Sequence, residues 1–336
     1  MKTTDNIMPF VRLGQELERR LDSGELDGAI ARSMEDNRWF TRESVGHALR
    51  AICTDMLREE TLRRWIGRYS GCPAARPARV GLIMAGNIPL VGFSDLLCVL
   101  ACGHECLVKV SSKDRAMTGY VIRLIREIEP GFRIGKIGDT TPDALIATGS
   151  DNTRRYFESM YPGIPALLRG SRLSAAVLAG DESDEELRGL RDDIFLYYGM
   201  GCRNVSRLFV PRGYDFGRLC DILRQRPVTH FPYLNNYRQA KAVRTMEDSA
   251  FIDGGFFLLA EKEAGTDNLS EIVYAYYDDP DEVREWLAVH DDRIQCVVGR
   301  SVRHPRRVGF GQAQHPTPWD YPDGVDVVDF LLRLSR

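Results

Sequence analysis

One cysteine lies in a setting that suits covalent catalysis. The segment 199–204 reads Gly-Met-Gly-Cys-Arg-Asn and directly precedes the run 205–210, whose composition predicts a strand. A turn of small residues can hold the Cys202 thiol at a cleft and leave a neighbouring backbone N–H free. This is the arrangement of a nucleophile with its own oxyanion donor.

The other cysteines do not share this setting. Cys98, Cys102 and Cys106 are spaced four residues apart, which would place them on one helix face and is compatible with metal ligation. They lie within or beside an apolar run, however, and only His104 and Glu105 are near enough in sequence to complete a ligand set. Cysteines in apolar surroundings usually behave as small hydrophobic residues. We therefore expect no metal site.

Three turns further upstream carry polar side chains where predicted strands end. In the first, segment 84–89 reads Met-Ala-Gly-Asn-Ile-Pro, so a strand runs into Gly and Asn and then a proline suited to a helix start. The amide of Asn87 could donate a hydrogen bond to a developing oxyanion. The alternative is that Asn87 only forms the turn.

The second turn brings a lysine and two hydroxyl groups to the end of a predicted strand. Lys109 is followed by Ser111 and Ser112. Such a cluster suits a ribose or its phosphate, although a lysine at a strand end is more often simply solvated. A ligand site here is therefore one of two open interpretations.

The third turn, Thr148-Gly149-Ser150, comes directly before an amphipathic stretch. It would place backbone N–H groups and a hydroxyl group at a helix N-terminus, where phosphate binds readily. An ordinary helix cap is the alternative. The sequence contains no G-x-G-x-x-G fingerprint, so a standard dinucleotide motif is not supported.

The elements that must position these turns follow from hydrophobic periodicity. Residues 1–69 repeat apolar positions at helical spacing, and segment 71–77 is typical of a linker. From residue 79 onward, short apolar runs alternate with amphipathic stretches, which predicts strands and helices in βαβ order and hence a parallel sheet. The expected organisation is a helical segment 1–70, a nucleotide-binding domain 71–182 and a catalytic domain 183–336.

Composition limits the classes of function. A chain of 336 residues with 43% hydrophobic content can bury two moderate cores. Its formal charge of −3 gives no reason to expect a nucleic acid partner. Eight scattered cysteines without a signal peptide predict a cytoplasmic protein, and the most apolar stretch is too interrupted to span a membrane.

Taken in order, these segments resemble the aldehyde dehydrogenase superfamily and, more closely, its LuxC-type acyl-CoA reductases, which reduce long-chain fatty acyl groups. The resemblance covers nearly the whole chain. It is carried by the following segments: Trp39–Thr41, Met84–Phe93, Leu107–Asp114, Tyr198–Val210, His230–Tyr237, Gly311–Gln314, Trp319–Tyr321 and Asp323–Asp326.

The resemblance implies a role for each turn. Cys202 would attack an acyl thioester and hold the acyl group, while Asn87 would be the oxyanion donor beside the Cys202 backbone N–H. Lys109 would bind the adenosine ribose of a nicotinamide cofactor. The segment Thr148-Gly149-Ser150 would be the phosphate-binding helix start. The implied fold is α/β, of the aldehyde dehydrogenase type, with a Rossmann-like nucleotide-binding domain and a second α/β catalytic domain.

Two departures from the superfamily pattern refine the implied reaction. Hydrolytic members carry a water-activating glutamate where this chain reads Leu-Arg-Gly-Ser-Arg at 168–172, and segment 161–180 contains no glutamate at all. An acyl-enzyme without that base should survive to meet a thiol or a hydride. Many NAD-preferring members carry a glutamate two or three residues after the cofactor lysine, where Ser111 and Ser112 stand here. Its absence favours NADPH, with NADH as the alternative.

The predicted function is reduction of an acyl-CoA thioester, fatty acyl by resemblance, to an aldehyde through a Cys202 thioester. An acyl phosphate reductase, a non-redox cysteine acyltransferase and a non-catalytic subunit are the alternatives. The acyl donor could also be an acyl carrier protein or a partner acyltransferase, and the resemblance implies a homo-oligomer. His230 could donate a proton in the active site, or it could be a loop histidine with a structural hydrogen bond.

Overall fold

The computed structural model describes residues 7–70, 72–138, 140–149, 151–262, 265 and 268–334. The chain forms two compact units. The first contains Met1–Ser171 and Pro316–Arg336, and the second contains Arg172–His315.

The first unit begins with a group of helices, as the periodicity predicts. They are α1 (Met8–Asp22), α2 (Asp27–Asp36), α3 (Arg42–Ala51), the π-helical turn η1 (Ile52–Met56) and α4 (Glu59–Ile66). Phe10, Leu13 and Leu17 recur at helical spacing on α1 and are all buried. A reciprocal capping box between Thr41 and Ser44 fixes the start of α3.

A five-stranded parallel sheet forms the centre of the first unit, in the order β3-β2-β1-β4-β5. Its strands are β1 (Arg79–Ile83), β2 (Glu105–Lys109), β3 (Ile134–Lys136), β4 (Ala144–Thr148) and β5 (Ala166–Arg169). Connecting helices are α5 (Phe93–Ala101), η2 (Ser112–Asp114), α6 (Arg115–Ile128) and α7 (Asp151–Met160). This order is that of a Rossmann-like sheet.

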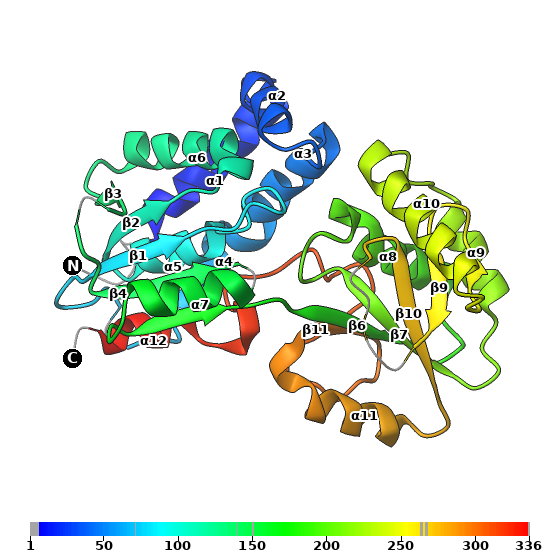
Figure 1. Ribbon diagram of the computed structural model, residues 1–336. Coiled ribbons are helices and arrows are strands. Elements are labelled where there is room, and N and C mark those ends of the chain that lie inside the picture. The colour runs from blue at the N-terminus through cyan, green and yellow to red at the C-terminus, as the bar shows by residue number, and fades with distance from the viewer. Residues whose placement is uncertain are drawn as a thin grey trace. The chain divides into compact units, whose positions relative to one another are not determined.

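Alternate residues of the central strand face two different apolar clusters. Val80 and Leu82 pack into the large core that the N-terminal helices, α5 and α6 share, whereas Ile83 packs with Phe157 of α7. Because side chains alternate along a strand, the two clusters lie on opposite faces of the sheet. Figure 1 shows α1 and α6 together on one side of this sheet.

The end of the chain belongs to the first unit. Helix α12 (Val327–Arg333) inserts Val327, Val328 and Leu331 into the large core, and it follows the short turn η5 (Pro322–Gly324). The hydroxyl of Tyr321 accepts a hydrogen bond from Trp65 Nε1 at 2.7 Å. The sequence pattern predicts this segment to belong to the second domain and the boundary to lie at residue 182, whereas the compact units divide at residues 171/172 and 315/316.

The second unit contains a seven-stranded sheet in the order β12-β11-β6-β7-β10-β9-β8. Its strands are β6 (Leu173–Val177), β7 (Val205–Pro211), β8 (Ile252–Asp253), β9 (Leu258–Glu261), β10 (Glu271–Tyr277), β11 (Ile294–Val298) and β12 (Arg307–Val308). Every pairing is parallel except that of β8 with β9.

Helices and short turns connect the strands of the second sheet. They are α8 (Asp184–Phe195), η3 (Leu196–Gly199), α9 (Phe216–Arg224), α10 (Phe231–Met246), α11 (Pro280–Val289) and η4 (Asp291–Arg293). Val283 and Leu287 of α11 pack on Ala175 and Val297 of the sheet. Parallel strands joined by helices confirm the predicted α/β class.

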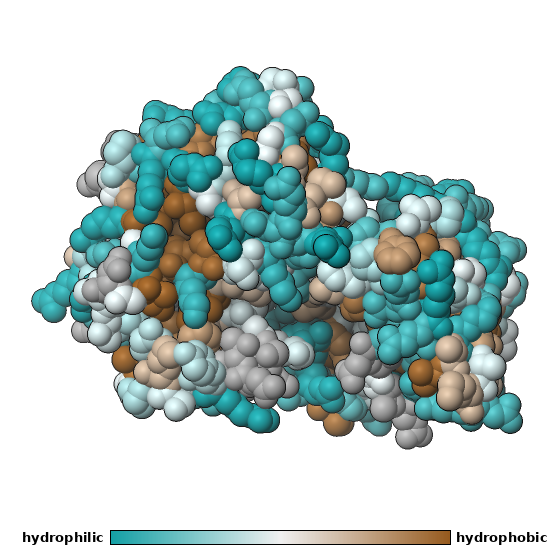
Figure 2. All heavy atoms as spheres, turned by 45° about the horizontal axis from the view of Figure 1, so that its top comes forward, coloured by the Kyte–Doolittle hydropathy of each residue, from teal (hydrophilic) through white to brown (hydrophobic). Residues whose placement is uncertain are grey.

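Polar side chains cover much of the face shown in Figure 2, with an apolar area over the first unit. Over the part of the chain that the structure describes, no helix is long and apolar enough to cross a membrane. Within the same part, no group of three His, Cys, Asp or Glu side chains is placed to hold a metal ion.

Candidate functional site

The three predicted ligand turns of the first unit lie at one edge of its sheet. β1 pairs in parallel with both β2 and β4, so the turns that follow these three strands share the carboxyl edge. After β3 the chain returns to place β4 on the other side of β1. The crevice outside β1 and β4 is therefore the topological switch point, where ligands of such sheets bind.

A cavity of about 530 Å³ opens at this carboxyl edge. Lys109 lines it at the end of β2, with Lys136 from β3 and Arg115 from the start of α6. The ammonium of Lys109 lies 5.5 Å from the ring centre of Phe157 on α7, at cation–π distance. The described lining residues include three cations and no carboxylate, so the cavity suits an anionic ligand with a flat apolar part.

The turn that carries Asn87 is held by side chains from two other elements. Asn37, at the end of α2, donates a hydrogen bond from Nδ2 to the Gly86 carbonyl at 3.0 Å. The carboxylate of Asp114 accepts one from the Leu90 backbone N–H at 2.8 Å. Leu90 adopts a φ of 56°, which is unfavourable for a side chain with a Cβ, so this hydrogen bond stabilises a strained position.

Asp114 is almost completely buried, with 1% of its surface exposed. Its Oδ2 also accepts a hydrogen bond from Thr118 Oγ1 at 2.8 Å. Burial raises the pKa of Asp114 to about 6, although both hydrogen bonds oppose this shift. The carboxyl group that fixes the Asn87 turn therefore titrates within a mildly acidic range.

The turns after β1 and β2 touch. A Cβ built on Gly86 would lie 2.5 Å from Ser111 Oγ, so only glycine fits at this position without a rearrangement. Ser111 itself caps the short helix η2 by accepting a hydrogen bond from the Lys113 N–H. Ser111 therefore has a structural role, whereas Ser112, the first residue of η2, is exposed.

A buried ion pair anchors the turn after β4. Arg169 Nη1 lies 2.5 Å from Asp95 Oδ2, and both side chains are about 95% buried. The Arg169 backbone carbonyl accepts a hydrogen bond from Gly149 N–H at 3.2 Å, and its Nη1 lies 3.4 Å from Thr148 Oγ1. Thr148 and Gly149 are thus placed at the carboxyl edge, while Ser150 lies outside the described residues.

In the second unit, Cys202 lies in the turn between η3 and the amino end of β7. All eight cysteines are among the described residues, and Cys202 is the exposed one, whereas the other seven are buried. Gly199 begins the turn with a φ of 74°, and a Cβ there would approach the Leu269 carbonyl oxygen to 3.1 Å. Both the positive φ and this close approach therefore favour glycine at position 199.

Asn204 organises the Cys202 turn from beneath. Its Nδ2 donates to the carbonyls of Asp193, Ile194 and Leu196, and its Oδ1 accepts from the Gly201 N–H at 2.9 Å. Ser174 of β6 donates from Oγ to the Cys202 carbonyl at 2.9 Å. The Cys202 turn is therefore held by a buried network at a rigid strand end, as a preorganised site requires.

The segment 311–314 also packs against this turn. Asp193 on α8 accepts hydrogen bonds from the backbone N–H groups of Gly311 at 2.7 Å and Ala313 at 2.8 Å. Arg203, next to Cys202, donates to the Ala313 carbonyl. Burial raises the pKa of Asp193 to about 7, against the effect of the two backbone hydrogen bonds.

His230 lies at the start of α10 and stacks on Tyr198. The two ring centres are 4.3 Å apart and the planes differ by 13°. Tyr197 and Tyr198 both adopt positive φ angles, of 59° and 58°, in the residues that lead into the Cys202 turn. His230 thus contacts the segment that precedes Cys202, and its role in proton transfer stays a prediction.

The structure gathers the predicted residues into two sets. Lys109 lines the cavity of the first unit, with Asn87, Ser111, Ser112, Thr148 and Gly149 on the same sheet edge, and Cys202 occupies its turn in the second unit. Sequence reasoning missed the supporting side chains Asn37, Asp114, Asp193 and Asn204. Of these, only Asn204 stands in a Gly-rich turn of the sequence, which is a local signal that could have pointed to it.

No family model matches this chain, and no curated protein does. Solved structures do match its fold. An acetylating aldehyde dehydrogenase from Geobacillus thermoglucosidasius is 10% identical, with a TM-score of 0.63 over 94% of this chain and 83% of that one. The aldehyde dehydrogenase KauB from Pseudomonas aeruginosa is 15% identical, with a TM-score of 0.62 over 91% and 73%.

A third match is the betaine aldehyde dehydrogenase of Staphylococcus aureus, solved in complex with NAD⁺. It is 12% identical, with a TM-score of 0.63 over 90% of this chain and 71% of that one. At such low identity the likeness concerns the arrangement of elements, not the chemistry of the site. The chain has the aldehyde dehydrogenase fold, with the predicted α/β architecture and two sheets whose pairings are parallel except that of β8 with β9.

Proposed function

We propose that this protein reduces an acyl-CoA thioester to an aldehyde, with Cys202 as the nucleophile and a nicotinamide cofactor as the reductant. The observation that carries the proposal is the exposed Cys202 in a turn fixed by Asn204, in a chain with no carboxylate in segment 161–180. A thioester formed on Cys202 has no water-activating base from that segment. It can therefore persist until it is reduced.

The proposed reaction has two stages, acyl transfer to Cys202 and reduction of the resulting thioester. The Cys202 thiolate attacks the acyl carbonyl carbon, the bond to the coenzyme A sulfur breaks, and coenzyme A leaves as a thiol after taking a proton. The bound cofactor supplies the hydride that reduces the thioester carbonyl. Collapse of the resulting oxyanion breaks the carbon–sulfur bond, releases the aldehyde and restores the Cys202 thiolate.

Asn87 is the proposed side-chain donor to the oxyanion of both steps, as the superfamily resemblance implies. Asn37 and Asp114 hold its turn in place, which supports a role that needs a fixed geometry. Loss of one such donor costs roughly 100-fold to 1000-fold in kcat in other enzymes. We expect a similar loss from Asn87→Ala.

The cavity beside Lys109 fits the nucleotide part of the cofactor. Lys109, Lys136 and Arg115 supply positive charge without a lining carboxylate, and Phe157 offers a ring for stacking. Ser111 and Ser112 stand at the two positions where a glutamate would repel a 2′-phosphate, and Ser112 is exposed on the same edge. These features support NADPH over NADH. The LuxC-type resemblance further proposes a fatty acyl group, delivered by coenzyme A, an acyl carrier protein or a partner acyltransferase.

The test mixes the protein with NADPH and octanoyl-CoA or tetradecanoyl-CoA and follows the loss of reduced-nicotinamide absorbance. We expect turnover with release of aldehyde, and its loss by at least about 1000-fold in Cys202→Ala. Cys220→Ala, which changes a buried cysteine of the same unit, is the matched control and should retain activity.

Three other results would contradict the proposal. Faster turnover with octanoyl phosphate than with the thioester would indicate an acyl phosphate reductase. Acyl exchange between thiols without NADPH oxidation would indicate an acyltransferase. Equal behaviour of the wild type and Cys202→Ala in every assay would indicate a non-catalytic protein.

A further inference from the structure

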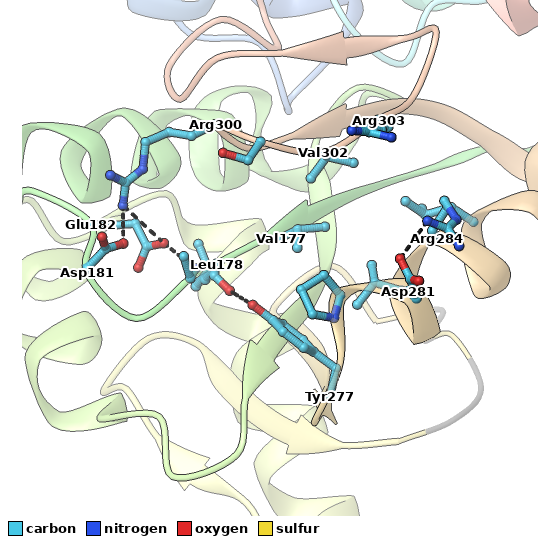
Figure 3. A pocket seen from close by; sticks show the side chains of 15 residues that line it. Val177, Leu178, Asp181, Glu182, Tyr277, Asp281, Arg284, Arg300, Val302 and Arg303 are labelled. Atoms are coloured by element: carbon cyan, nitrogen blue, oxygen red, sulfur yellow. Dashed lines mark hydrogen bonds and ion pairs between the residues drawn. The ribbon is translucent and has the colours of Figure 1, made fainter.

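A second cavity lies wholly within the second unit. Its volume is about 450 Å³, within the range of small-molecule sites. It is lined by the residues that follow β6, the residues that follow β11, and the first turns of α11 (Figure 3). We call it the β6/β11 pocket.

The topology of the sheet favours ligand binding at this place. From β6 the chain proceeds to β7 and β10 on one side, and then returns through α11 to place β11 on the other side of β6. The gap between the carboxyl ends of β6 and β11 is thus the topological switch point of this sheet. Cys202 lies at the amino end of β7, which is parallel to β6, so the pocket and the nucleophile occupy opposite edges.

One side of the pocket is acidic, and its charged side chains already have hydrogen-bond or ion-pair partners. Arg300 pairs with Asp181 and, at 3.2 Å, with Glu186. Glu182 accepts hydrogen bonds from the backbone N–H groups of Ala179 and Gly180. With three acidic residues in the first turn of α8, this side repels phosphate groups. A dinucleotide, which would need its pyrophosphate here, is disfavoured.

The other side carries the cationic side chain of Arg303. Arg303, on the loop after β11, is exposed and makes no hydrogen bond or ion pair with any described residue. Figure 3 places it on the same side of the pocket as Arg284, whose guanidinium pairs with Asp281 at 2.5 Å on the helix surface. Arg303 is therefore available to a ligand anion.

The wall between these two sides is apolar. Val177, Val283, Leu287 and Val302 line it, and they belong to the apolar cluster between α11 and the sheet. Tyr277 presents its ring, because its hydroxyl donates to the Leu178 carbonyl at 2.7 Å. An apolar body placed here loses contact with water, which is favourable.

We propose that the β6/β11 pocket binds a small organic anion that has one carboxylate or phosphate group on an apolar body. The anionic group pairs with Arg303, and the apolar body lies on Val177, Val283 and Val302. A guanidinium can hold either group with two parallel hydrogen bonds. This site is separate from the proposed catalytic reaction and does not depend on it.

The test measures binding of octanoate, octyl phosphate and neutral octanol to the full chain by isothermal titration calorimetry. We expect one of the two anions to bind in a 1:1 ratio and at least about tenfold more tightly than octanol. Arg303→Gln should raise the Kd of that anion by about tenfold. The matched control is Arg293→Gln, which changes an exposed arginine at the opposite end of β11 and should leave the Kd unchanged.

Two further measurements assign the binding to this pocket. Val302→Trp should fill the cavity and abolish binding. A photoreactive diazirine analogue of octanoate should label residues 177–179, 280–287 or 300–303, and Cys202→Ala should be labelled equally. Absence of anion binding, equal binding of octanol, insensitivity to both Arg303→Gln and Val302→Trp, or labelling confined to other segments would overturn the proposal.

Discussion

At the scale of single residues, exposure separates Cys202 from the other cysteines. A thiol must reach the reagent to be alkylated, so the native protein should incorporate one equivalent of iodoacetamide rapidly, at Cys202, and the denatured protein eight. Mass spectrometry of the intact protein measures this count. Cys202→Ala should take up no rapid equivalent. Rapid labelling at any of the seven buried positions would contradict this picture of the turn.

Ser112 provides a test of cofactor choice. A glutamate at this exposed position would place a negative charge near Lys109 and oppose a 2′-phosphate. We expect Ser112→Glu to raise KM for NADPH by about tenfold and to leave KM for NADH within about twofold. Steady-state kinetics with both cofactors measures the ratio, and Ser112→Gln is the control of equal size. An equal rise for both cofactors would argue against charge as the cause.

The residues that bear the proposed chemistry could be predicted, and those that support them could not. Cys202 directly precedes one strand-like run and Lys109 ends another, and a local pattern is enough to single them out. Asp114 contacts Leu90, and Arg169 contacts Asp95, which is 74 positions away in the chain. Such pairs form only when the sheet brings two loops together, so no local sequence pattern predicts them.

At the scale of elements, the turn before β7 depends on one buried amide. Asn204 is 4% exposed and holds four backbone groups. Asn204→Ala would leave buried polar groups unpaired, so we expect roughly 2 to 4 kcal/mol of lost stability and a lower kcat. Denaturant unfolding and steady-state kinetics measure the two effects. Asn235→Ala, an exposed position on α10, should change neither.

The turn after β1 should make stability depend on pH. The pKa of Asp114 is about 6 in the folded protein against an ordinary value of 3.8. The folded state therefore binds the proton more tightly, and its stability falls as the pH rises from about 4 to about 6. We expect the wild type to lose about 2 to 3 kcal/mol over this range relative to Asp114→Asn. Urea unfolding of both proteins at pH 4, 5, 6 and 7 measures the difference, and parallel curves would refute it.

Strong periodicity decided which elements the sequence could predict. In the alternating part of the sequence, the apolar runs 80–84 and 106–110 and the amphipathic stretch 117–128 coincide with β1, β2 and α6 to within two residues at either end. Strand β3 covers three residues that include a glycine, and β8 and β12 cover two each. Segments this short carry no period to detect, and only their neighbours in the sheet define them.

At the scale of the whole molecule, the chain leaves the first unit and returns to it. Val327 and Leu331 of α12 complete a core whose other members begin at Ile7. The apolar residues near the end of the chain form helix α12 (Val327–Arg333) within the first unit. Contacts over such sequence distances arise from tertiary packing and have no local trace in the sequence.

Every described residue that lines the Lys109 cavity belongs to the first unit, so cofactor binding can be tested without measuring catalysis. A ligand that binds only the folded state protects the segments it touches and stabilises by about 2.7 kcal/mol at 100 times its Kd. In hydrogen exchange, NADPH should therefore slow residues 108–110, 136–138 and 157–161 of the first unit, which line the Lys109 cavity. Lys109→Ala should lose this protection, whereas Cys202→Ala should keep it. Protection limited to the second unit would show that the nucleotide binds elsewhere, because the Lys109 cavity is lined by residues of the first unit.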